Sequence, residues 1–232
     1  SNTTSSNNTA VGYQAGYSNT SSGANTFVGH QSGYSNTGSN NSAFGYGSLR
    51  LNTSGVFNVA VGLQSLYSNT TTSNSTAVGY QAGYSNTSGG VQAFGYGAYN
   101  TAMGGYALSA NTTASNNTAV GYKAGYANTT GASNTAVGNL ALDSATTASY
   151  NTILGSQAGS ALVTGDGNCM IGSLAGLLST GSGNTFVGSI NVGVSNGCAS
   201  AMTTGSKNTI LGGYTGNQDG LDIRTASNRI VL

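Results

Sequence analysis

Few side chains in this chain could support acid–base, nucleophilic or metal chemistry. Its 232 residues include one histidine, His30, and two cysteines, Cys169 and Cys198. The acidic residues are all aspartates: Asp143, Asp166, Asp219 and Asp222. A nucleophile needs a base held beside it and a metal needs several clustered ligands, so residues this sparse favour neither. We therefore expect no enzymatic activity and no catalytic, cofactor-binding or metal site.

The same residues have structural interpretations. The spacing of the two cysteines fits no zinc pattern and favours free thiols, since a disulfide is possible only if the fold brings their Cα atoms within roughly 7 Å. Asp166 lies between two glycines and is typical of a turn, because a calcium-binding repeat would need Asp in every unit. Asp219 and Asp222 are close in sequence, and we expect them to have a structural role.

Composition excludes several kinds of partner. Charged residues make up 4% of the chain and the net charge is +1, against roughly 25% charged residues in an ordinary soluble domain. We therefore expect no nucleic acid partner. No apolar run approaches the ~18 residues of a membrane span, so we expect no membrane insertion. The 38 glycines and the many Asn, Ser and Thr indicate either disorder or a repeat architecture.

The sequence motif Asn-Thr-Ala-Val-Gly, which we call the phrase, recurs with variants along the whole chain. Its spacing distinguishes a disordered chain from a repeat fold. Its glycines are Gly12, Gly29, Gly45, Gly62, Gly79, Gly95, Gly104, Gly121, Gly138, Gly155, Gly172, Gly188 and Gly212. Ten of the twelve intervals between them are 16 or 17 residues. Disordered low-complexity sequence does not keep phase in this way, so the period predicts a repeat fold.

Two irregular intervals interrupt the repeat. The interval from Gly95 to Gly104 is 9 residues, and that from Gly188 to Gly212 is 24. We predict a repeat domain over residues 1–212 with about 13 coils, a short coil near 96–104 and an insert near 190–207. Residues 213–232 leave the repeat and are predicted to form a closing segment that ends in a strand.

The residues just before the repeat glycine predict a short strand that is apolar on both faces. A small or apolar residue stands two positions before the glycine and another apolar residue stands one position before it, as in Ala119 and Val120. Adjacent strand residues point to opposite faces, and one coil can bury only the face toward its own interior. We expect each coil to hold two short strands and two turns, with coils stacked roughly 4.8 Å apart. The outward face then needs cover from another chain.

An asparagine stands four residues before most of the repeat glycines. Stacked coils would place these side chains above one another in a hydrogen-bonded ladder that satisfies buried polar groups. The predicted ladder residues are Asn8, Asn25, Asn41, Asn58, Asn117, Asn134 and Asn151. Stacking also explains the low charge, because a repeated charge would lie beside its own counterpart and be repelled.

The repeated Asn-Thr-Ala-Val-Gly-Tyr-Gln-Ala-Gly closely resembles the head repeat of YadA-like trimeric autotransporter adhesins, which also occurs in bacteriophage tail fibres. The motif is carried, for instance, by Asn117, Ala119, Val120, Gly121 and Ala124, and the match covers roughly residues 7–212. The resemblance implies an all-β, left-handed parallel β-roll or β-solenoid, an intertwined or side-by-side homotrimer, and an extracellular role in surface attachment. These repeats are slightly longer than the family's, so we expect longer turns.

Tyrosines form two columns in the repeat, which looks more like phage fibres than bacterial adhesins. His30 falls in the first column and is interpreted as a replacement for Tyr in a stacked ladder. Tyr suits recognition because it is both apolar and able to form hydrogen bonds. The candidate contacts to a host surface glycan or protein are Tyr13, Tyr17, Tyr34, Tyr46, Tyr80, Tyr84, Tyr122 and Tyr126.

Three hypotheses about function follow. The leading one is a structural segment of a phage tail fibre that mediates attachment to the host cell surface. The alternatives are the head of a bacterial trimeric autotransporter adhesin and, from another class, an ice-binding solenoid, since Thr9, Thr26 and Thr76 begin a Thr column on the strand. The last residues resemble the stretch before the self-cleaving chaperone domain of many phage tail fibres, which implies that Leu232 is a terminus left by its release.

Overall fold

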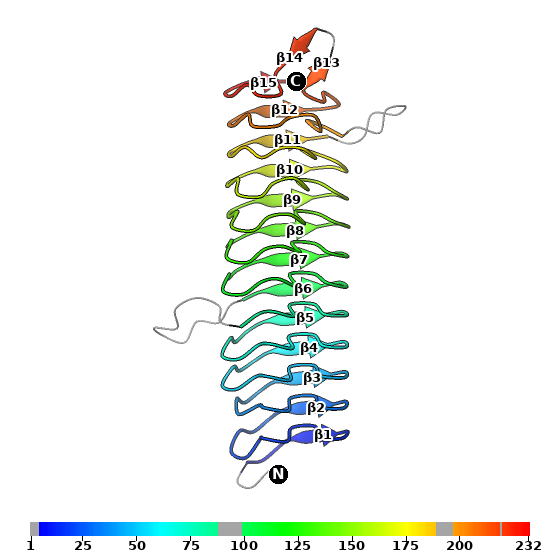
Figure 1. The fold of residues 1–232 in the computed structure, drawn as a ribbon, viewed down its shortest axis with the longest axis vertical. Coiled ribbons are helices and arrows are strands. Elements are labelled where there is room, and N and C mark those ends of the chain that lie inside the picture. The colour runs from blue at the N-terminus through cyan, green and yellow to red at the C-terminus, as the bar shows by residue number, and fades with distance from the viewer. Residues whose placement is uncertain (1–4, 88–98, 189–196, 219) are drawn as a thin grey trace. The chain divides into compact units, whose positions relative to one another are not determined.

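A computed structural model of the chain describes residues 5–87, 99–188, 197–218 and 220–232. These residues form strands and turns and contain no helix. The chain divides into two compact units, Ser1–Asn117 and Thr118–Leu232. The prediction of an all-β parallel solenoid with coils of about 17 residues is confirmed within each unit (Figure 1).

Unit 1 stacks six parallel strands in chain order: β1 (Thr9–Val11), β2 (Thr26–Val28), β3 (Ser42–Phe44), β4 (Val59–Val61), β5 (Thr76–Val78) and β6 (Thr101–Met103). The register places each repeat residue opposite its counterpart, as Thr9 opposite Thr26. The strands coincide with the predicted phrase, since its residues are the ones that suit a half-buried strand.

Unit 2 repeats this arrangement with β7 (Thr118–Val120), β8 (Thr135–Val137), β9 (Thr152–Leu154), β10 (Cys169–Ile171), β11 (Thr185–Val187) and β12 (Thr209–Leu211). The predicted closing strand is β15 (Ile230–Val231), which pairs in parallel with β12. Between them, β13 (Asn217–Gln218) and β14 (Leu221–Asp222) form an antiparallel pair.

The described residues form one strand per coil from β1 to β11, so the expected second strand is wrong. The remainder of the coil turns repeatedly through left-handed backbone, for example at Gln64 (φ 57°) and Leu66 (φ 46°). An extended strand cannot contain such residues. Backbone hydrogen bonds still tie these turns to the next coil, as from the Leu66 N–H to the Ala82 carbonyl at 3.0 Å.

The repeat glycine forms the corner at which the strand ends. Gly62 has φ 127°, and a Cβ built on it would lie 2.6 Å from the carbonyl oxygen of Gly79 in the next coil. Any side chain would therefore separate the stacked coils. This close approach explains the glycine at corners such as Gly12, Gly62 and Gly138, which lie against the corner of the next coil.

The middle strand residue, two positions before the corner glycine (position −2), fills the interior of each coil. Large residues such as Phe27 are accompanied by glycine at position +4, because a Cβ on Gly33 would lie 2.5 Å from the Phe27 ring. Where position −2 is alanine, as at Ala43, a buried leucine such as Leu49 often occupies position +4. Strand and turn thus share the interior volume.

The two predicted irregular regions lie partly outside the described residues. The phrase at Gly95 and residues 96–98 of the short coil lie outside the described residues, and β5 pairs directly with β6. Of the insert near 190–207, residues 190–196 are not described. From Gly197 the regular stack is present, since the Gly176 N–H donates to the Cys198 carbonyl as the Gly16 N–H does to Ser32.

Candidate interaction surfaces

The outward side chains of the strands form an uncharged surface in each unit, which we call the strand face. It consists of positions −3 and −1, occupied mainly by Thr and by Val, Leu or Ile. Met103 is 45% exposed and Val11 58% exposed, whereas the −2 residue Ala102 between such columns is buried. The predicted strand with one buried and one uncovered apolar face is therefore present.

The predicted asparagine ladder lies inside the coils. Along the ladder, the Oδ1 atom accepts a hydrogen bond from the backbone N–H of the residue one coil further on, as from Asn58 to Asn41 at 3.0 Å and from Asn151 to Asn134 at 3.0 Å. The Asn58 Nδ2 donates to the Thr72 carbonyl in its own coil at 2.8 Å. The ladder thus joins neighbouring strands to turns rather than being a simple stack of amides. Asn25, Asn41, Asn58, Asn117, Asn134 and Asn151 are buried, and Asn8 in the first coil is half-buried.

A second asparagine column at position +7 was missed by sequence reasoning. Amides donate to the previous column member, from Asn69 to Asn52 at 2.8 Å and from Asn86 to Asn69 at 3.0 Å. The recurrent Tyr-Ser-Asn-Thr in the turns was the available signal. In unit 2 this column becomes largely apolar, with Ala145 and Leu162 buried in it.

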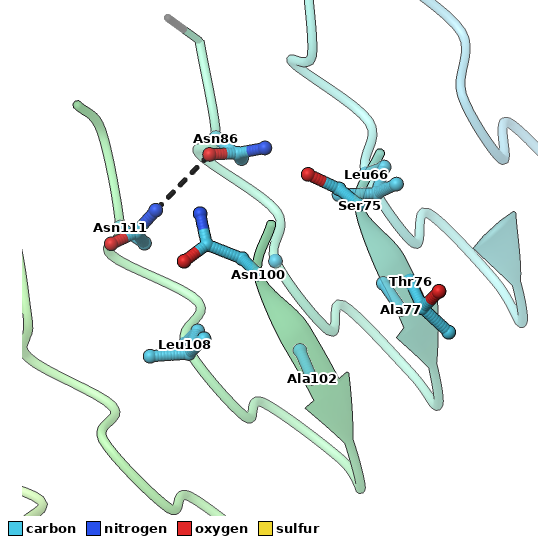
Figure 2. A pocket seen from close by; sticks show the side chains of 10 residues that line it. Leu66, Ser75, Thr76, Ala77, Asn86, Asn100, Ala102, Leu108 and Asn111 are labelled. Atoms are coloured by element: carbon cyan, nitrogen blue, oxygen red, sulfur yellow. Dashed lines mark hydrogen bonds between the residues drawn. The ribbon is translucent and has the colours of Figure 1, made fainter. Parts of the chain in front are cut away.

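Ser75 interrupts the first ladder in unit 1. Its hydroxyl is buried without a hydrogen-bond partner among the described residues. A cavity of about 10 Å³ adjoins it, lined also by Asn86, Asn100 and Asn111, and Figure 2 shows the Asn111–Asn86 hydrogen bond beside Ser75. The shorter serine side chain leaves space that an asparagine fills in other coils.

Aromatic side chains at position +5 of unit 1 form a continuous stack. Tyr17 lies on Tyr34 with ring centroids 5.1 Å apart, and Tyr67 lies on Tyr84 with centroids 5.2 Å apart. Arg50 occupies the layer between them, with its guanidinium carbon 5.3 Å from the Tyr34 ring and 5.6 Å from the Tyr67 ring. Both distances suit cation–π contact.

A second aromatic column runs along position +1 of unit 1. His30 lies between Tyr13, at 5.1 Å, and Tyr46, at 4.9 Å, so the histidine stands in the Tyr ladder as expected. Leu63 interrupts the column after Tyr46, and beyond it Tyr80 meets Tyr106, which stands at position +2, edge to face at 5.0 Å. Of the eight candidate receptor contacts, unit 1 thus holds Tyr13, Tyr17, Tyr34, Tyr46, Tyr80 and Tyr84 in two columns.

Glutamines at position +2 lie between these columns. The Gln31 amide donates to Gln14 at 2.9 Å, and Arg50 Nε donates to Gln31 at 3.0 Å. In unit 2, Lys123 occupies the same position, with Nζ 5.5 Å from the Tyr122 ring and 5.2 Å from the Tyr126 ring. Position +2 therefore touches both aromatic columns. Sequence reasoning did not identify Arg50 or the glutamines as members of this surface.

The described residues show no grouping suited to metal or nucleophilic chemistry. No cluster of three or more potential ligands is found among them, and both cysteines are free thiols. Burial raises the pKa of Cys198 to about 11. Asp222 and Arg224 form an exposed ion pair of 2.7 Å, and the hydrogen bonds from Arg224 lower the pKa of Asp222. Within the described parts of the chain, no helix is long and apolar enough to span a membrane.

Comparison with known proteins gives no match: no family model, no curated protein and no solved structure corresponds to this chain. The resemblance to adhesin and tail-fibre repeats therefore rests on the repeat residues themselves.

Proposed function

We propose that this chain is a structural segment of an extracellular attachment fibre, which assembles as a homotrimer through its strand faces. The observation that carries the proposal is the uncharged, half-exposed Thr and aliphatic strand face in each unit. A contiguous apolar surface of this kind on a monomer marks an interaction site. A second copy of the chain presents the same columns at the same spacing, so it can cover them along their length.

A phage tail fibre that attaches to a host cell surface is the form of this function that we favour. It is supported by the resemblance of the repeats and by the Tyr-rich columns. The head of a bacterial trimeric adhesin is the alternative, and it would use the same assembly and the same faces. The left-handed sense of the coil and the number three belong to this proposal, because they come from the resemblance.

Native mass measurement tests the assembly. We expect the wild-type chain to be a trimer and a Val61→Lys, Val78→Lys variant to dissociate, because two charges in each strand face would be buried without partners. Thr71→Lys is the control, since Thr71 is exposed outside the strand face, and it should remain trimeric. A monomeric wild-type chain, or a trimer that tolerates both lysines in the strand face, would contradict the proposal.

An ice-binding solenoid is the second candidate, because the Thr column does lie outward on the strand face. A regular array of hydroxyl and methyl groups without charge is the kind of surface that ordered water can match. Thermal hysteresis and ice shaping by the chain, lost in the Val61→Lys, Val78→Lys variant, would establish it. A trimer with no effect on ice growth would exclude it.

A further inference from the structure

We propose that the aromatic columns of unit 1, with the glutamines between them, bind an extended neutral polysaccharide that runs along the stack of coils. We call this surface the aromatic face: Tyr13, His30, Tyr46 and Tyr80 at position +1, Gln14, Gln31, Gln64 and Gln81 at position +2, and Tyr17, Tyr34, Arg50, Tyr67 and Tyr84 at position +5. The inference rests on the proposed attachment function and identifies the chemical class of the receptor.

The aromatic face offers ring edges and hydroxyl groups rather than ring faces. Within the +5 column the paired rings are nearly parallel, at 4° for Tyr17 and Tyr34 and 7° for Tyr67 and Tyr84. Each inner ring face is therefore covered by its neighbour, so a sugar ring cannot stack on the faces of most rings in the column. The rims of the rings remain accessible beyond the first coil, since Tyr46 is 51% and Tyr80 44% exposed and Tyr34 is half-buried.

Stacking also holds these groups in place before any ligand arrives. Arg50 donates from Nη1 to the Tyr67 hydroxyl at 2.9 Å and from Nε to Gln31 at 3.0 Å. The Gln81 amide donates to Gln64 at 2.8 Å. Side chains already ordered in this way lose little further conformational entropy on binding.

The charge of the aromatic face favours a neutral ligand rich in hydroxyl groups. Its phenol and amide groups can each donate and accept hydrogen bonds, as sugar hydroxyls do. Its one permanent cation, Arg50, is already engaged with Gln31 and two tyrosines, and none of its three columns contains a carboxylate. A nucleic acid would need several free cations to neutralise its phosphates, so that class of ligand is not favoured.

The spacing of the aromatic face favours an extended chain rather than a single sugar. Neighbouring layers lie 4.9 to 5.2 Å apart between ring centroids, close to the length of one pyranose in an extended, equatorially linked polysaccharide such as cellulose or chitin. A chain lying along the stack would then meet similar groups in most layers, the exceptions being Leu63 at position +1, Gly47 at position +2 and Arg50 at position +5. Affinity should therefore rise with chain length, because each further contact is intramolecular.

The fold itself supplies the substitutions that test this surface. Position +1 holds Ser156 and Ser173 in unit 2, and position +5 holds Ser109 and Ser160. Serine is therefore compatible with the coil at both positions. Tyr99 and Tyr150 provide a matched control, because they are exposed tyrosines outside the two columns.

The experiment measures binding of the full chain to soluble cello-oligosaccharides and chito-oligosaccharides of increasing length by calorimetry. We expect wild-type affinity to rise with length, and a variant carrying Tyr13→Ser, Tyr17→Ser, Tyr34→Ser and Tyr46→Ser to lose at least about tenfold in Kd. The Tyr99→Ser, Tyr150→Ser control should bind like the wild type. A second variant with phenylalanine at the same four positions keeps the rings and removes the hydroxyls, and it should be weakened as well.

Three results would overturn the proposal: no binding of either neutral series, loss of binding in the control as large as in the serine variant, or full binding by the phenylalanine variant. The mass of each variant is measured in parallel. A trimer that adheres to cells but binds neither series refutes the polysaccharide site and leaves the fibre function standing, whereas a monomer that does not adhere refutes the fibre function.

Discussion

Replacing Asn151 by alanine tests how much the internal asparagine ladder contributes to stability. Asn151 is 1% exposed. Its Oδ1 accepts the backbone N–H of Asn168 at 2.8 Å, and its Nδ2 donates to the Gly165 carbonyl at 3.0 Å. Alanine would leave both of these backbone groups without their partner inside the coil. The backbone N–H of residue 151 would keep its bond to Asn134.

The magnitude follows from those two groups. A buried donor or acceptor left unsatisfied costs roughly 1–3 kcal/mol, so the Asn151→Ala variant should lose roughly 2–6 kcal/mol. The matched control is Asn139→Ala, which removes the same side chain from an exposed turn. That control should change stability by less than about 0.5 kcal/mol.

Hydrogen exchange is the suitable assay, because stacked repeats can open locally before they unfold as a whole. Protection should fall in the coils on either side of residue 151, with urea denaturation giving the total loss. If the Asn151→Ala and Asn139→Ala variants are equally stable, the ladder does not hold neighbouring coils together and the reasoning fails.

Three further predictions concern single side chains. Gly62→Ala should lower the free energy of unfolding in urea by about 3 kcal/mol or more. The new Cβ would clash with the next coil, and the alanine backbone would have to adopt an unfavourable φ. Gly167→Ala, where nothing lies within 4 Å, should cost only about 1–2 kcal/mol, and equal losses would contradict the close-approach argument. Phe57 is 57% exposed and has a left-handed backbone with φ 58°. Asparagine tolerates this conformation better, so Phe57→Asn should stabilise the fold by roughly 0.5–1 kcal/mol and raise the temperature of half unfolding. A lower temperature of half unfolding would show that the Phe57 ring contributes to packing. Because the pKa of Cys198 is raised to about 11, its contribution to stability should be complete below the unfolded thiol pKa and lost as pH rises toward 11. Iodoacetamide mapping at pH 9 should leave Cys198 unlabelled in the folded chain, and rapid labelling would contradict its burial.

Much of the fold could be predicted from the sequence because the repeat is short and regular. The period of the glycines located the strand of every described coil, and the alternation of a strand placed Ala119 and Val120 on opposite faces, while the structure showed that Ala119 is the buried one. The ladder of Asn58 and its counterparts was predictable from its phase alone. The turns were not, because left-handed backbone at residues such as Leu66 depends on the space left inside the coil rather than on residue type.

What the sequence determined by itself is the period, the phase and which repeat residues share a face of the strand, since these depend only on spacing and on the geometry of a strand. The tertiary structure alone decided which side chains meet across coils. It placed Arg50 between Tyr34 and Tyr67, and it made β5 the direct neighbour of β6 despite the intervening phrase at Gly95. Contacts of this kind join residues from different coils. They therefore depend on the path of the backbone through each coil, which the local sequence pattern of a single coil does not fix.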